Sequence, residues 1–436
     1  MINIENVLSE LNKQNIQTWF DLGLFIDRFK EKQSAASFNK DLNAFGGELQ
    51  TGGIAFITFY FAIDGITVET EKYAKTFKNI YPSIPVHYIA GEIKPEADEL
   101  IHKDAFKKVI KEMDGFDNWP LYNDFFRIKM ERGSTEYNEL ILKFWDEVLV
   151  LVEKLGRYIE DNNITLLYLI NVCSNPGNVS LGLATVLISE YLGIPVINNN
   201  HDFYWEGGNR KVTIKSNSLK KGPRDFFFHN AHVGEFFSVI DMLYPWESRS
   251  WLNVNINKLQ HTHLVNTKGH NPANSAMIGT AVDTKPIQIG RRDIIKALLQ
   301  MASIFANKKD SITVHTVGNH IESKRSLMPI LLGYKTIKKF DFVSNNIVFL
   351  QPTRVISRKS IELNFLLVKQ LFANVDFAKK FQNNPQLTLS LLVSGPIPHG
   401  QQNYYKYLLE DFKIFLDELA SEFRSRVLLG FFFSEF

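Results

Sequence analysis

The sequence predicts an α/β protein made of two Rossmann-like units, each a parallel sheet with helices on its faces. Short apolar runs rich in β-branched and aromatic residues alternate with stretches that carry apolar residues at helical spacing. The runs are apolar at consecutive positions, which is typical of strands buried on both faces of a parallel sheet. This alternation occurs over residues 54–200 and begins again at residue 346, which indicates two units.

The first unit follows from the order of these segments. Ile4 to Lys32 has helical spacing and residues 33–50 are rich in Ser, Asn and Gly, so we predict a helical N-terminal extension and linker over 1–50. The segments that follow are strand 54–60, helix 67–77, strand 85–89, helix 139–162, strand 165–172, helix 179–192 and strand 194–198. Weaker patterns predict strands at 253–257 and 277–282 and a helix at 292–305, and the stretch 285–345 stays largely unassigned.

The second unit has a clear pattern but few strands. Strands are expected at 346–351, 387–393 and from Arg426, with helices at 360–372 and 403–423 between them. A doubly wound domain has about five or six strands, so we expect an incomplete C-terminal domain. The predicted boundaries place an N-terminal Rossmann-like domain at 51–335 and the partial C-terminal domain at 336–436.

Composition narrows the class of protein and its setting. The 49 Lys and Arg against 47 Asp and Glu give a net charge of +2, which argues against a nucleic-acid partner held by bulk charge. Cys173 is the only cysteine, so an intrachain disulfide and a Cys-based zinc site are excluded. The first residues lack a signal-peptide pattern and no run approaches about 18 apolar residues. We expect a cytoplasmic protein; peripheral membrane contact and oligomeric state stay open.

Two candidate sites follow strands of the first unit, where parallel sheets place their ligands. Asp64 and Gly65 come between a strand and a helix, where backbone N–H groups can approach a ligand oxygen or phosphate. An ordinary Asp-Gly turn is the simpler reading and is favoured for these two residues alone. The segment Asn198 to Glu206 holds His201, Asp202 and Trp205, and this mixture of polar and aromatic groups suits a sugar. The alternative there is a capped loop with a hydrogen-bonded histidine.

A third candidate closes the first strand of the second unit. Arg354 and Lys359 flank a turn that enters a helix, so their charges and the helix N-terminus could clamp a diphosphate. Only 14 of the 49 cationic residues are Arg, and Arg grips phosphate in a bidentate way that Lys does not match. We therefore favour the clamp over a solvated basic turn.

Other motifs are weaker. The pairs His229/His232 and His261/His263 lack a third ligand, so no metal site is predicted. Glu410 and Glu418 form an E-x7-E spacing inside an amphipathic stretch, which we attribute to chance. No G-x-G-x-x-G, P-loop, G-x-S-x-G or H-E-x-x-H occurs.

At these residues the sequence resembles the retaining enzymes of glycosyltransferase family 4, whose GT-B architecture has two Rossmann-like domains facing across a cleft. The resemblance runs in order along the chain. It covers 54–69 (first strand and glycine loop), 198–206 (the "HD" loop), 253–260 (the "INS" strand) and 349–362 (the "GR…KG" donor clamp). Gln-Pro-Thr-Arg and His-Asp-Phe-Tyr-Trp-Glu are most similar to the mannosylglucosylglycerate synthase-like branch.

The resemblance implies roles for these residues. Arg354 and Lys359 would hold the diphosphate of a nucleotide-sugar, His201 would contact the transferred sugar, and Gly65 would lie near the donor phosphates and the acceptor. Asp64, Asp202 and Trp205 would line the acceptor side. Such enzymes need no DxD metal site, and none occurs here. The family's glycines on either side of the clamp are Thr353 and Ser360 in this chain, and its "PS..EGFG" segment with an E-x7-E is missing.

The expected activity is therefore transfer of a hexose from a UDP- or GDP-sugar to an alcohol or sugar acceptor with retention of configuration. No cofactor or metal is expected. A truncated, non-catalytic protein with a binding or scaffold role is one alternative, and a nucleotide-sugar epimerase on the same architecture is the other.

Overall fold

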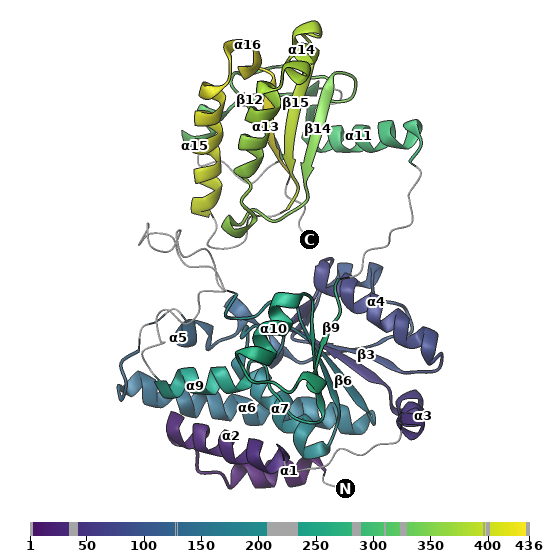
Figure 1. The fold of residues 1–436 in the computed structure, drawn as a ribbon, viewed down its shortest axis with the longest axis vertical. Coiled ribbons are helices and arrows are strands. Elements are labelled where there is room, and N and C mark those ends of the chain that lie inside the picture. The colour runs from purple at the N-terminus through teal and green to yellow at the C-terminus, as the bar shows by residue number, and fades with distance from the viewer. Residues whose placement is uncertain are drawn as a thin grey trace. The chain divides into compact units, whose positions relative to one another are not determined.

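The computed structural model describes residues 3–34, 42–126, 128, 130–206, 234–280, 289–308, 311–322, 329–395, 397 and 402–432. These residues form two compact units, one from the N-terminal part up to residue 280 and one from residue 289 onward (Figure 1). Among the residues named above, His229 and His232 lie outside the described ranges, as does the end of the strand predicted at 277–282.

The first unit is built around a seven-stranded parallel sheet. Its order is β5 (Phe106–Val109), β3 (Val86–Ala90), β1 (Ile54–Ile57), β6 (Leu166–Ile170), β7 (Val196–Asn200), β8 (Trp251–Asn255) and β9 (Ser275–Met277). The register pairs Ile54 with Val86 on one side and with Leu166 on the other. This is the 3-2-1-4-5-6 order of a doubly wound fold with one further strand, so the predicted Rossmann-like class is confirmed.

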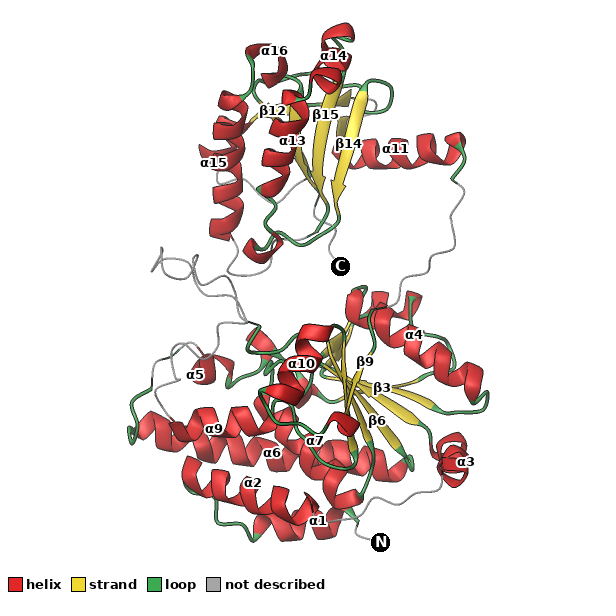
Figure 2. Ribbon diagram, viewed as in Figure 1, coloured by secondary structure: helices red, strands yellow, loops and turns green. Residues whose placement is uncertain are grey.

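Helices cover both faces of this sheet (Figure 2). They are α1 (Ile4–Asn12), α2 (Trp19–Ser34), α3 (Leu42–Gly52), α4 (Gly65–Ile80), α5 (Tyr122–Phe126), α6 (Thr135–Asp161), α7 (Val179–Leu192), α9 (Gly234–Leu243) and α10 (Lys258–Asn266). Helix α7 begins at the Asn178 cap and ends at Gly193, whose φ of 67° is the left-handed conformation that glycine adopts readily. Helix α7 is buried on nearly all sides, because α1, α6 and α9 contact it as well as the sheet. A mostly apolar sequence without a polar face is typical of such a buried helix.

The N-terminal helices form part of the core of the first unit, which corrects the predicted extension over 1–50. Helix α1 turns the buried side chains Ile4, Val7 and Leu11 inward, and α1 packs against α6 and α7. Trp19 of α2 is 1% exposed within the same core. The helices themselves were predicted correctly, but a sequence pattern does not identify the surface that an apolar stripe contacts. Part of the predicted linker forms α3.

The second unit has a mixed five-stranded sheet in the order β12 (Val314–Thr316), β13 (Ile330–Gly333), β16 (Val427–Phe431), β15 (Thr388–Val393) and β14 (Asn346–Gln351). Strands β14, β15 and β16 are parallel and correspond to the three predicted strands. Strand β13 runs antiparallel to β16 and parallel to β12. A short antiparallel pair, β10 (Ala306–Lys308) and β11 (Ser311–Ile312), precedes them.

The predicted boundary at 335 therefore lies too late in the chain. Strands β12 and β13 belong to the sheet of the second unit, and α11 (Arg291–Phe305) places Phe305 in the same core. These strands have only three and four residues, too short for a periodic pattern to register in the sequence.

Helix α11 packs on one face of the second sheet through Phe305, and the other described helices of this unit lie on the opposite face. They are α12 (Val317–Glu322), α13 (Leu363–Ala373), α14 (Val375–Asn383), α15 (Gln402–Glu418) and α16 (Ser421–Arg424). Buried side chains of α13 and α15, including Phe365 and Phe412, pack against β15 and β16 in one core. In the described parts of both units, every helix is too short or too polar to cross a membrane.

Candidate functional site

The loop after β7 is held in place by backbone hydrogen bonds to neighbouring elements. The Oδ1 atom of Asn171, at the end of β6, accepts from the backbone N–H groups of His201 (2.9 Å) and Asp202 (3.2 Å). Gln260 of α10 donates to the His201 carbonyl oxygen at 3.1 Å and to the carboxylate of Glu206. The loop is thus fixed from two sides, and His201 is positioned at the carboxyl end of the sheet.

The His201 side chain is a half-buried imidazole whose buried Nε2 atom has no hydrogen-bond partner among the described residues. Burial lowers the pKa of His201, the charge of Lys72 lowers it further, and the charge of Glu69 opposes both. The ring is therefore neutral at pH 7, because the ordinary histidine pKa is already about 6.5. A neutral ring can donate one hydrogen bond and accept another.

Glu69 is the charged group that the sequence interpretation missed. It lies near the start of α4, is 3% exposed, and forms an ion pair with Lys72 at 3.0 Å. Its charge also acts on Tyr73 and Tyr168. The pKa of Tyr73 is raised mainly by burial, and the charge of Glu69 raises it further. In a sequence, a glutamate within an amphipathic helix is normally assigned to the solvent-exposed face. The only signal for Glu69 was its position shortly after the Asp64-Gly65 turn.

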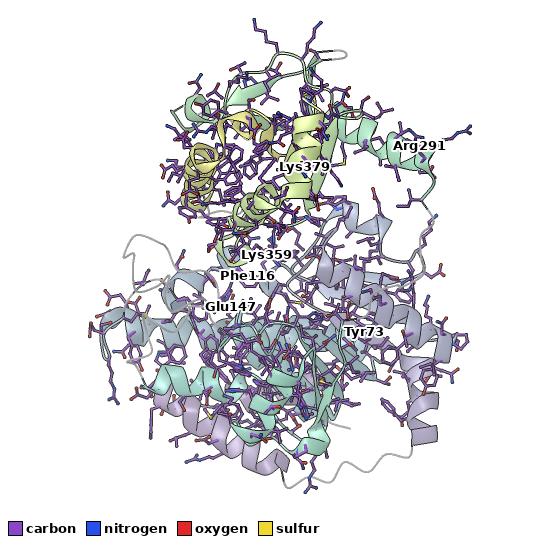
Figure 3. The ribbon with its side chains drawn as sticks, turned by 45° about the horizontal axis from the view of Figure 1, so that its top comes forward. Tyr73, Phe116, Glu147, Arg291, Lys359 and Lys379 are labelled. Atoms are coloured by element: carbon purple, nitrogen blue, oxygen red, sulfur yellow. The ribbon has the colours of Figure 1, made fainter. Side chains whose placement is uncertain are left out.

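Two tyrosines and an asparagine complete this group. The rings of Tyr73 on α4 and Tyr168 on β6 lie 5.0 Å apart, and Asn199 Nδ2 donates to the Tyr168 hydroxyl at 3.0 Å (Tyr73 is labelled in Figure 3). Asn199 is fully buried, and its Oδ1 atom has no partner among the described residues. We call the four residues Glu69, Tyr73, Tyr168 and Asn199 the α4–β7 cluster, which lies beside His201.

Asp64 and Gly65 begin α4. The Asp64 carboxylate caps the helix by accepting from Thr67 N–H at 2.9 Å and from the Thr67 hydroxyl at 3.1 Å. A Cβ atom added to Gly65 would meet nothing within 4 Å, so open space lies beside this first turn. The hydrogen bonds of Asp64 are those of an ordinary helix cap, which is the interpretation favoured for Asp64 and Gly65 taken alone. The open space beside Gly65 leaves the N-terminus of α4 accessible.

Trp205 is already packed by other rings. It stacks on Phe203 with ring centroids 4.0 Å apart, and His263 of α10 lies 4.7 Å away. The Lys268 ammonium lies 5.7 Å from the centre of the Trp205 ring. Asp202 is half-buried in the same loop. The ring of Trp205 therefore helps to build the loop, whereas His201 offers an unpartnered polar atom.

The candidate phosphate clamp lies in the second unit, after β14. Arg354 and Lys359 are both exposed. Arg354 precedes the short 3₁₀ helix Ser357–Lys359, and Lys359 is the last residue of this helix, ahead of α13. Val355 and Ile361 are buried in the core, so the backbone that carries the two cations is anchored. Ser360 has a φ of 46°, a left-handed conformation in which the resembled family has glycine.

Two contacts hold this loop. The Tyr404 hydroxyl of α15 donates to Glu362 Oε2 at 2.5 Å and accepts from Ile361 N–H at 3.0 Å. Gly395, after β15, donates its N–H to the Thr353 carbonyl oxygen at 3.1 Å. A Cβ atom at Gly395 would lie 2.5 Å from Arg354 N and closer still to the Thr353 carbonyl oxygen, so only glycine fits without displacing the loop.

Gly395→Ala should therefore lower activity by moving the backbone that carries Arg354. A displacement of about 1 Å can reduce a rate by about 100-fold, so we expect a loss of at least about tenfold in kcat/KM. The matched control is Gly23→Ala in α2, where an added Cβ meets nothing within 4 Å. The control should keep full activity and gain up to about 1 kcal/mol of stability. Equal activity of both variants would mean that the Thr353–Arg354 backbone has no role.

The predicted residues thus fall into two groups. Asp64, Gly65 and the His201 loop lie at the carboxyl edge of the first sheet, and Arg354 and Lys359 lie at the carboxyl end of β14 in the second. Within the described ranges no three His, Cys, Asp or Glu side chains gather in a way that could hold a metal ion. His261 contacts the Ser275 hydroxyl and His263 the Trp205 ring, so both have protein partners.

These features define an α/β protein with two sheet units and polar groups at the carboxyl ends of both. No protein-family model and no curated protein matches the sequence. Among solved structures, the chain is similar to Anabaena HepE in complex with UDP and glucose, with 13% identity, coverage of 87% of this chain and 69% of the other, and a TM-score of 0.42. It is also similar to a glycosyltransferase from Rickettsia africae, with 10% identity, coverage of 88% and 69%, and a TM-score of 0.43. A UDP-GlcNAc 2-epimerase from Neisseria meningitidis, bound to UDP-GlcNAc, has 9% identity, coverage of 88% and 72%, and a TM-score of 0.35.

Proposed function

We propose that the protein transfers a hexose from a UDP- or GDP-sugar to a hydroxyl group of an acceptor, with retention of configuration, as a member of glycosyltransferase family 4. The observation that carries this proposal is the pair of exposed cations Arg354 and Lys359 on an anchored loop at the carboxyl end of β14. This is the edge at which parallel α/β sheets bind nucleotides. Two fixed cations there suit a diphosphate better than an uncharged ligand.

The chemistry follows from charge. As the glycosidic bond of the donor breaks, the nucleoside diphosphate gathers negative charge, and Arg354 and Lys359 would stabilise that charge in the transition state. The guanidinium can form two parallel hydrogen bonds to phosphate oxygens, whereas Lys359 supplies a point charge. Because the loop is fixed by Gly395 and Tyr404, little reorganisation accompanies the reaction.

His201 would act as a hydrogen-bonding group toward the transferred sugar. Its lowered pKa keeps it neutral, so it can orient a hydroxyl group without adding charge. Asp64, Gly65, Asp202 and Trp205 are proposed to border the acceptor side. The membership of the mannosylglucosylglycerate synthase-like branch, the independence from metal and the cytoplasmic location are part of the same proposal.

The test is nucleoside diphosphate release from UDP-glucose and GDP-mannose by the 436-residue chain, with and without a panel of small sugar and polyol acceptors. Release that depends on an acceptor would support transfer. Conversion of the donor sugar without release of nucleoside diphosphate would identify an epimerase. No change in the donor at any acceptor concentration would favour a non-catalytic protein.

A further inference from the structure

The α4–β7 cluster and the adjoining His201 contain buried polar atoms that have no hydrogen-bond partner in the part of the chain that the structure describes. Asn199 Oδ1 is fully buried and unpaired among the described residues, and so is the Nε2 atom of His201. Burying a polar atom without a hydrogen bond is unfavourable by about 1–3 kcal/mol, so such atoms usually indicate a missing ligand or water. Asn199 lies in the last part of β7 and His201 directly follows this strand, at the edge of the sheet where ligands bind.

The orientation of the Asn199 amide is set by its neighbours. Its Nδ2 group donates to the Tyr168 hydroxyl at 3.0 Å, and the Tyr168 hydroxyl in turn bonds to Tyr73. The described residues use the donor side of the Asn199 amide, and none of them donates to its carbonyl oxygen. The group that fits there must bring a hydrogen-bond donor.

The charge of the cluster points to the same kind of ligand. Glu69 is 3% exposed, and its charge reaches His201, Tyr73 and Tyr168. The Lys72 ammonium lies 3.0 Å from its Oε2 atom and is already engaged by it. Because the Lys72 side chain is 38% exposed and screened by water, it offsets the charge of the buried Glu69 carboxylate only in part, so an anionic ligand placed here is disfavoured relative to a neutral one. A ligand with several hydroxyl groups would instead find two acceptors, the Glu69 carboxylate and Asn199 Oδ1.

We propose that the α4–β7 cluster is the acceptor subsite, and that it selects an uncharged sugar or polyol over acceptors that carry a carboxylate or phosphate. The inference rests on the proposed transferase function and adds the chemical class of its acceptor. Glu69 and Asn199 then determine specificity, and Tyr73 and Tyr168 position Asn199. An acceptor of the glycerate type would be disfavoured, so this inference is compatible with the wider family proposed above and opposes membership of its mannosylglucosylglycerate synthase-like branch.

The first measurement compares matched acceptors that differ only in charge: glucose with glucuronate, and glycerol with glycerate. With a fixed nucleotide-sugar donor, the neutral member of each pair should have a kcat/KM at least about tenfold higher. Glu69→Gln should narrow this preference by a similar factor, because it removes the negative charge but keeps the size of the side chain. The matched control is Glu153→Gln, which removes an exposed helical ion pair with Arg157 and should leave the preference unchanged.

The second measurement does not depend on catalysis. Saturation-transfer NMR with the unmodified chain and no donor should show contact to glucose but not to glucuronate, and Asn199→Ala should abolish the signal from glucose. Circular dichroism of each variant separates loss of binding from loss of folding. If glucose binds with this selectivity but no nucleoside diphosphate is ever released, the subsite stands and the transferase function fails.

Transfer without selectivity for neutral acceptors would contradict the proposed subsite but not the transferase function. Acceptor-dependent release with equal use of glucose and glucuronate would leave the transferase function intact and contradict the selectivity. Absence of glucose binding to the unmodified chain, or glucose binding that survives both Glu69→Gln and Asn199→Ala, would also contradict the proposal.

Discussion

Arg354→Ala should lower the turnover of a nucleotide-sugar by about 100-fold while leaving the stability of the protein nearly unchanged. Loss of about 3 kcal/mol of transition-state stabilisation corresponds to about two decades in rate. The side chain is exposed, and substitutions at such positions usually change stability by no more than about 0.5 kcal/mol. The measurements are steady-state kinetics with saturating acceptor and thermal unfolding of the same preparation.

The matched control for this variant is Lys379→Ala. Lys379 is an exposed cation on α14, which leads into the amino end of β15, so it lies apart from the loop that carries Lys359 (Figure 3). The control removes one positive charge from the same unit and should retain full activity. Equal losses in the two variants would indicate that overall charge, not the clamp, attracts the donor. An unchanged rate in Arg354→Ala would exclude its role in binding the diphosphate.

Trp19→Ala should destabilise the first unit by about 3–5 kcal/mol, the range typical of a buried tryptophan truncated to alanine. The indole is 1% exposed, packs against Phe125 and Phe144, and donates to the Tyr137 carbonyl oxygen at 3.3 Å. Such a loss is a large part of the stability of an ordinary domain. Urea unfolding followed by circular dichroism would show it as a lower transition midpoint.

Phe20→Ala offers a neighbouring comparison in the same helix. Phe20 is 61% exposed, so its removal should change the free energy of unfolding by no more than about 0.5 kcal/mol. Similar midpoints for the two variants would contradict the conclusion that α2 belongs to the core. A destabilised Trp19→Ala beside an unchanged Phe20→Ala would agree with it.

The positions of the buried parallel strands and of the long helices along the chain were the most predictable part of the fold. The segment at 179–192 was assigned to the same residues that form α7, and the strand at 346–351 to those of β14. Continuous apolar runs and complete helical periods carry this information locally. The short strands β12 and β13 could not be recognised, because three or four residues do not show a period and β13 pairs antiparallel with a strand about 100 residues later.

The candidate sites were partly predictable because this signal, too, is local in the sequence. Polar residues after strands are visible in the sequence, and this gave His201, Asp64, Arg354 and Lys359. Glu69 was missed because its burial arises from packing between α4 and the sheet. Asn199 lay within a segment already selected, but which atom lacks a partner depends on Tyr168, a residue 31 positions earlier.

Gly395 shows the limit of glycine as a sequence signal. The structure shows that the missing Cβ of Gly395 makes room for the Thr353–Arg354 backbone. The two segments are about 40 residues apart in the chain, so this contact has no local signature. The same holds for the Tyr404 hydroxyl that secures Ile361.

The most direct test of the proposed function is proton NMR of a reaction that contains the 436-residue chain, UDP-glucose and an uncharged acceptor chosen from the panel. The account predicts UDP together with a new α-glycosidic signal, since the donor is α-linked and retention preserves that configuration. A β-glycosidic product would contradict retention. A changed configuration within the intact nucleotide-sugar, without UDP release, would contradict transfer itself.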